Sequence, residues 1–150
     1  MNFKGHVPVA GGSLYAEIDG SGPAIALVHA GVANLRMWDA HVPAMAEHHT
    51  VIRYDTRGFG NTESDHVEFS NRADLIAVLD HAGAERALLV GVSRGGSIVL
   101  DTALEYPERT TGLVFVAGGV LGYQPSASLV DAATWEEAER HWKAKEWDWP

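Results

Sequence analysis

The chain has 150 residues, of which 46% are hydrophobic, and its formal net charge at pH 7 is −9. This length suffices for one hydrophobic core, and the acidic balance disfavours nucleic acid and anionic membranes as partners. The sequence contains no cysteine, which excludes disulfides and thiolate metal sites. Its first residues lack the apolar stretch of a signal peptide, and no apolar run approaches the length of a bilayer span. We therefore expect a cytoplasmic protein whose partner is a small molecule.

Hydrophobic periodicity predicts short strands that alternate with helices. The expected strands cover residues 3–9, 13–19, 24–28, 50–54, 86–90 and 112–117, and the expected helices cover residues 36–47, 70–82 and 94–106. The first two strands form a hairpin, and the last strand, which carries the longest apolar run, is expected to be a central one. This order is typical of a mostly parallel sheet with helices on both faces.

The most informative motif is Gly91-Val92-Ser93-Arg94-Gly95, between an expected strand and an expected helix. A strand that turns directly into a helix forces the middle residue toward an unfavourable φ/ψ region, and neighbours without a Cβ permit the close approach. The serine is then exposed where a substrate carbonyl can meet it, and the helix start favours an oxyanion. Ser93 is the predicted catalytic nucleophile. The alternative is an ordinary exposed serine on a flexible glycine turn.

Two further motifs follow expected strands. His29-Ala30-Gly31-Val32 comes after the strand at 24–28, and Asp55-Thr56-Arg57-Gly58-Phe59-Gly60 comes after the strand at 50–54. Together with the strand–helix turn at Ser93, which corresponds to the nucleophile elbow of that family, these motifs resemble the α/β-hydrolase superfamily, in particular its cap-bearing esterase and lactonase members. The resemblance implies an α/β-hydrolase-like, mostly parallel sheet with helices on both faces.

The resemblance also implies an oxyanion hole built from two backbone N–H groups. One would come from Arg94, the residue after the nucleophile, and the other from the loop that follows residues 24–28. Alignment of that loop favours Gly31, with Val32 as the alternative. The guanidinium of Arg94 has no role in this arrangement, and neither a metal nor a cofactor is required.

The remaining motif residues have structural roles in this resemblance. His29 would hold the loop rather than act as a base, and Asp55 and Arg57 would bridge a tight turn as a clamp. Gly91 and Gly95 would allow the elbow to form.

The acid and the histidine of a catalytic triad do not follow Ser93 in a usable arrangement. The only later histidine is His141, and about 15 Å of expected helix separates it from Asp131. We therefore expect an amino-terminal part of a longer hydrolase, cut before the last strands, with residues 1–122 as the core and residues 123–150 as the start of a helical cap. A carboxyl-terminal fragment or a homo-oligomer would complete it.

The predicted function is a serine hydrolase that acts on a small ester or lactone, with the triad acid and histidine missing from this chain, so that the chain alone is inactive. Haloperoxidase-like and carbon–carbon bond hydrolases share the elbow and stay open. The alternative from another class is a non-catalytic binding or partner-assembled protein of the same fold. Three tryptophans at seven-residue spacing would pack within the cap or line an aromatic pocket, namely Trp135, Trp142 and Trp149.

Overall fold

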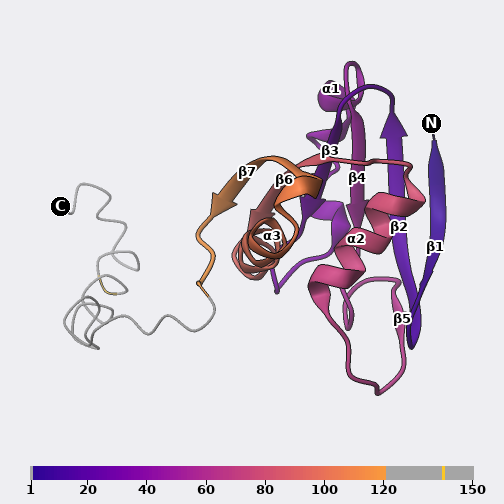
Figure 1. Ribbon diagram of the computed structural model, residues 1–150, viewed down its shortest axis with the longest axis vertical. Helices are drawn as coiled ribbons and strands as arrows, with labels where there is room; N and C mark the ends of the chain where they lie inside the picture. Colours follow the sequence, from indigo (N-terminus) through magenta and orange to yellow (C-terminus); the bar gives the residue numbers. More distant parts are fainter. Residues whose placement is uncertain (1, 121–139, 141–150) are drawn as a thin grey trace.

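The computed structural model describes residues 2–120 and 140 (Figure 1). Its strands are β1 (Phe3–Val9), β2 (Gly12–Gly20), β3 (Ala24–Val28), β4 (Thr50–Tyr54), β5 (Glu63–Ser64), β6 (Ala87–Val92) and β7 (Thr110–Val116). Its helices are η1 (Leu35–Trp38), α1 (Val42–Ala46), α2 (Asn71–His81), α3 (Arg94–Glu105) and η2 (Pro107–Arg109). None of these helices is long and apolar enough to cross a bilayer. The expected start of a cap lies outside the described residues, as do Asp131, His141 and the three spaced tryptophans.

All the strands belong to one sheet, with the order β1-β2-β4-β3-β6-β7 and β5 paired to β2 off this path. The pairs β3–β4, β3–β6 and β6–β7 are parallel, whereas β2 is antiparallel to both β1 and β4. Val28 lies opposite both Tyr54 and Gly91 in the register. The carboxyl ends of β3, β4 and β6 therefore meet at one edge of a mostly parallel sheet, as the sequence predicts.

Helices cover both faces of the sheet, which confirms this prediction and explains why β3 is apolar along its whole length. One face of β3 contributes Ala26 and Val28 to a cluster that contains Leu75 of α2 and Ile98 of α3. The other face contributes Ile25 and Leu27 to a cluster with Trp38 of η1 and Val42 of α1. The loop after β3 therefore emerges between two packed layers.

The helix expected over residues 36–47 is broken into η1 and α1. The side chain of Asn34 accepts the N–H of Arg36 at 2.9 Å and so begins η1. Pro43 lies in the first turn of α1, where the N–H that proline lacks would have no helical partner. A continuous helix would instead bring its ring against the carbonyl one turn earlier. Pro43 therefore begins a second helix rather than continuing the first.

Strand β7 lies at the edge of the sheet, so the expectation of a central strand is wrong for the described residues (Figure 1). Within them, its pairing partner is β6 alone. The side chains at the end of β7 stay between 38% and 44% exposed, although all are apolar, and they are Leu113, Val114, Phe115 and Val116. An unpaired strand edge of this kind is a template for pairing with another strand.

Candidate active site

Ser93 is the residue between the end of β6 and the first residue of α3. Its backbone has φ 54° and ψ −119°, and only Ala117 shares a positive φ among the non-glycine residues that the structure describes. The N–H of Ser93 donates to Val116 at 2.8 Å, and its carbonyl accepts the N–H of Ser97 at 3.1 Å. Such a conformation costs about 1–3 kcal/mol and persists only where the surroundings hold it. The result is an exposed serine on a tightly held backbone.

Gly91 and Gly95 allow this turn because other backbone atoms occupy the space of a side chain. A Cβ on Gly95 would overlap the carbonyl oxygen of Val28 and lie 2.6 Å from that of His29. A Cβ on Gly91 would overlap the carbonyl oxygen of Gly95. Since backbone atoms cannot rotate away, the first turn of α3 can touch the end of β3 only with glycine at these positions.

The loop after β3 lies directly against the start of α3. A Cβ on Gly31 would lie 3.2 Å from Cδ and 3.3 Å from Cβ of Arg94, whereas the neighbouring Val32 is 98% exposed. Because α3 begins at Arg94, its first N–H groups have no acceptor within the helix, and the helix dipole is positive there. The two segments that the sequence assigns to an oxyanion hole are therefore in contact.

His29 is completely buried at the start of this loop. Its Nε2 accepts the N–H of Thr56 at 3.0 Å, and its Nδ1 lies 2.7 Å from the carbonyl oxygen of Ala30. These partners place the proton on Nδ1. Burial lowers the pKa of His29, and the positive charge of Arg94 acts in the same direction, whereas the Ala30 hydrogen bond and Asp55 oppose it. A neutral ring with both nitrogens engaged supports the loop and is not available as a base for Ser93.

The expected bridge between Asp55 and Arg57 is wrong, because the two side chains bind different segments. The carboxylate of Asp55 accepts the N–H groups of Leu35 and Asn61, both at 2.8 Å. The guanidinium of Arg57 instead pairs with Asp74 of α2, because it extends toward that helix. Asp55 therefore fixes the start of η1 and the turn after β4, and Arg57 fixes α2.

The sequence offered no sign of a role for Thr56, which lies between these two charged residues. Its Oγ1 accepts a hydrogen bond from Nη1 of Arg94 at 2.6 Å and lies 3.1 Å from Nε2 of His29. The guanidinium of Arg94 also donates to Asn71 at 3.3 Å and stacks over the ring of Phe59. The side chain of Arg94 is therefore held by three residues from two segments, the turn after β4 and the start of α2. Sequence patterns could not reveal these contacts because all three are tertiary.

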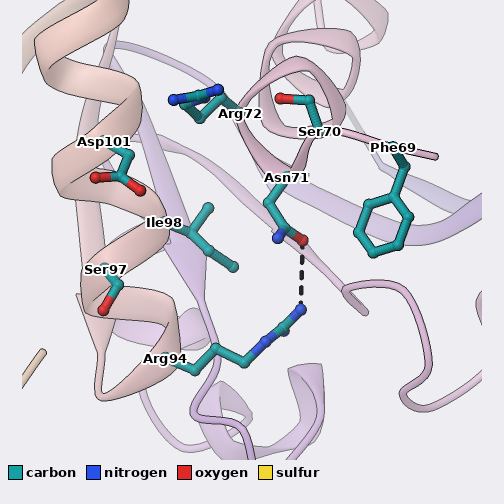
Figure 2. A pocket seen from close by; sticks show the side chains of 8 residues that line it. All are labelled: Phe69, Ser70, Asn71, Arg72, Arg94, Ser97, Ile98 and Asp101. Atoms are coloured by element: carbon teal, nitrogen blue, oxygen red, sulfur yellow. Dashed lines mark hydrogen bonds between the residues drawn. The ribbon is translucent and has the colours of Figure 1, made fainter. Parts of the chain in front are cut away.

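A pocket of about 500 Å³ lies beside the elbow, between the start of α2 and the first turns of α3 (Figure 2). Its lining mixes apolar, polar and charged side chains, namely Phe69, Ser70, Asn71, Arg72, Arg94, Ser97, Ile98 and Asp101. Arg94 forms one wall and adjoins Ser93 in the chain. Among residues 2–120 and 140, no group of three or more histidine, aspartate or glutamate side chains is placed to hold a metal ion.

A strained, exposed serine at a strand–helix turn, on the carboxyl edge of a mostly parallel sheet, defines a class of hydrolases with a nucleophile elbow. The family model described as "alpha/beta hydrolase fold" matches residues 23–149. The chain belongs to this family.

Three known proteins show how wide the chemistry of similar chains is. The chain is 32% identical over 151 residues to a fluoroacetate dehalogenase from a Burkholderia species, covering 95% of this chain and 46% of the relative. A solved hydrolase from Pseudomonas aeruginosa is 32% identical, with a TM-score of 0.70, over 90% of this chain and 51% of that one. The enol-lactonase from Burkholderia xenovorans is 29% identical, with a TM-score of 0.69, over 74% of this chain and 45% of that one. The chain thus spans about half the length of these proteins.

Proposed function

We propose that the protein is a serine hydrolase that cleaves a small ester or lactone, with Ser93 as the nucleophile. The observation that carries this proposal is the strained, exposed backbone position of Ser93 at the start of α3. Its Oγ attacks the acyl carbon, and the N–H groups of Gly31 and Arg94 stabilise the resulting oxyanion. Collapse of this intermediate expels the alcohol and leaves an acyl-enzyme, which water then hydrolyses to the acid.

Serine at the elbow supports an acyl substrate over the alkyl halide of the dehalogenase relative. If the Ser93 oxygen displaced a halide from an alkyl carbon, the product would be an ether, which water does not cleave under enzymatic conditions. Attack on an acyl carbon gives an ester, and a second attack by water regenerates the serine. The similarity to an enol-lactonase agrees with acyl chemistry.

The general base in this proposal is a histidine outside the residues that the structure describes, oriented by an acid that also lies outside them. His29 is unsuitable because Thr56 and Ala30 occupy its two nitrogens. The removal of the hydroxyl proton from Ser93 and its delivery to the leaving alcohol both require a base within hydrogen-bond reach of that oxygen.

The pocket beside Arg94 would receive one part of the substrate. Phe69 and Ile98 offer it apolar contact, while Asn71 and Ser97 offer hydrogen-bonding groups (Figure 2). This mixture suits a small, weakly polar group, since a few placed polar atoms orient a ligand that is otherwise held by apolar contact.

The test is covalent labelling of the full-length protein with a fluorophosphonate ester, read by intact mass. We expect one phosphonyl group per chain, lost in Ser93→Ala and retained in Ser13→Ala, a control serine on β2. Labelling of Ser93→Ala at the parent rate would show that another residue is the nucleophile. A folded protein that neither labels nor hydrolyses activated esters would favour the non-catalytic binding role.

A further inference from the structure

We infer that Thr56 is a positioning residue whose hydroxyl joins the two loops of the proposed oxyanion hole into one unit. The inference rests on the proposed function, because it concerns how the N–H groups of Gly31 and Arg94 are held relative to each other. It assigns a role to the side chain of Arg94 that requires no contact with the substrate.

The contacts at Thr56 impose a direction on its hydrogen bonds. A guanidinium can only donate, so the 2.6 Å contact makes Oγ1 of Thr56 the acceptor from Arg94. The hydroxyl proton is then directed to Nε2 of His29, 3.1 Å away. Thr56 is only 1% exposed, so its hydroxyl depends on these partners, and a buried hydroxyl that loses them costs about 1–3 kcal/mol.

The other ring nitrogen of His29 carries the connection to the oxyanion loop. Its Nδ1–H donates to the carbonyl oxygen of Ala30 at 2.7 Å, and the N–H of Ala33 donates to the same oxygen at 3.0 Å. In a planar trans peptide the carbonyl and the following N–H point in opposite directions. Fixing the oxygen of Ala30 therefore fixes the direction of the N–H of Gly31.

The chain of hydrogen bonds runs from Arg94 to the peptide that precedes Gly31. The backbone N–H of Arg94 is one donor of the proposed oxyanion hole, and its guanidinium begins the chain through Thr56 and His29 that ends at the peptide of the other donor, Gly31. The stem of Arg94 also lies against Gly31. One side-chain relay, here called the Arg94–Thr56–His29 relay, thus connects the residues that carry the two donors.

The test replaces the hydroxyl while keeping the shape of the side chain. Thr56→Val removes the link but retains the backbone N–H that Nε2 of His29 accepts. We expect kcat of the full-length protein for an activated neutral ester to fall about tenfold, with KM unchanged within about twofold, since a misaimed oxyanion donor acts on the transition state. Thr56→Ser, which restores the hydroxyl, should recover most of the loss.

The matched control is Thr102→Val. Thr102 is completely buried on α3, and its hydroxyl donates to Ile98 at 2.8 Å, outside the relay. This variant makes the same chemical change and should keep the parent kcat. In addition, Arg94→Met should lower kcat to a level similar to that of Thr56→Val. The double variant should have a kcat no lower than that of the poorer single variant, because both substitutions break the same chain of hydrogen bonds.

A second readout does not depend on catalysis. The amide resonance of Gly31 and the Nδ1–H resonance of His29 should both move in Thr56→Val and stay in place in Thr102→Val. If the chemical shifts of these two resonances change although the parent protein hydrolyses no ester, the relay is supported and the proposed function is wrong.

Parent-like kcat in Thr56→Val, or an unmoved Gly31 amide, would overturn the relay while leaving the nucleophile assignment intact. Should Thr56→Val not fold, Arg94→Met removes the first donor of the relay and decides the question by the same two resonances.

Discussion

The guanidinium of Arg57 forms a two-pronged, buried ion pair with the carboxylate of Asp74. Nε lies 2.7 Å from one carboxylate oxygen and Nη2 lies 2.9 Å from the other, and the two side chains are 3% and 6% exposed. The same guanidinium donates to the carbonyl oxygens of Ala10 and Gly11 at 2.7 and 3.0 Å. One side chain from the turn after β4 therefore joins α2 to the β1–β2 hairpin.

Asp74→Ala should lower the free energy of unfolding by about 3–5 kcal/mol, because it leaves the buried charge of Arg57 unpaired. Urea unfolding monitored by tryptophan fluorescence measures this loss. The control is Arg72→Ala, which breaks a surface pair with Glu105 in which both side chains are more than 40% exposed and should cost less than about 1 kcal/mol. Equal losses in the two variants would contradict the assignment of the Arg57–Asp74 pair as a structural clamp.

Gly95→Ala should destabilise the protein by about 3 kcal/mol, because the new methyl group meets the carbonyl oxygens of Val28 and His29. The variant should also lose phosphonate labelling at Ser93, since the elbow moves away from β3. Gly83→Ala is the comparison. Gly83 has a φ of 68°, which strains any residue with a side chain, but a Cβ there would meet open space. That change should cost about 1 kcal/mol and leave labelling intact, and a larger effect in Gly83→Ala would refute the steric explanation.

His29 should make stability depend on pH. Because burial lowers its pKa below the unfolded value of 6.5, the unfolded chain binds a proton first as the pH falls. The stabilisation is complete above about pH 6.5 and is lost as the pH falls from there through the folded pKa. The free energy of unfolding, measured between about pH 7.5 and 5, should decline less steeply in His29→Gln. NMR titration of the His29 ring gives the direct check, and a midpoint at or above 6.5 would disprove the prediction.

The edge of β7 should cause residues 1–150 on their own to associate with a second copy. Its apolar side chains are half exposed, and within the described residues its outer side is unpaired. Val114→Lys, at the middle of this edge, should reduce the sedimentation coefficient toward that of a monomer. Leu104→Lys serves as the control, because Leu104 is an exposed apolar residue on α3. If both lysine variants dissociate the complex equally, general surface hydrophobicity rather than the strand edge is responsible.

The strands and the elbow could be predicted because their signals are local. An apolar run of five residues marks β3, and β4 is apolar apart from Thr50 and Arg53; the bounds of both strands agree with the sequence-based ranges. The setting of Ser93 between an apolar strand and a helix likewise depends on neighbours in the chain. The two-residue strand β5 has no such signal, since Glu63 and Ser64 form it only by pairing with Gly12 and Ser13.

The partners of charged side chains could not be predicted, because they depend on which segments the fold brings together. Arg57 reaches Asp74 rather than the nearby Asp55, and the pair Glu17–Arg53, at 2.6 Å, is buried between β2 and β4. Charged residues inside these two strands, Glu17 and Asp19 on β2 and Arg53 on β4, were the available signal for the second pair. Sequence alone left open which charges would meet, since an antiparallel register decides it.

The register of β3 against β6 has a consequence for folding. Val28 and Gly91 are paired across these parallel strands, and β4 and α2 lie between them in the chain. Parallel pairing of distant segments is slow, because a long loop must close before any contact compensates for the lost chain entropy. The reactive geometry of Ser93 depends on this closure, because Gly95 packs against the end of β3. The time at which the refolding full-length protein first reacts with a phosphonate therefore gives the latest time by which these two strands have joined.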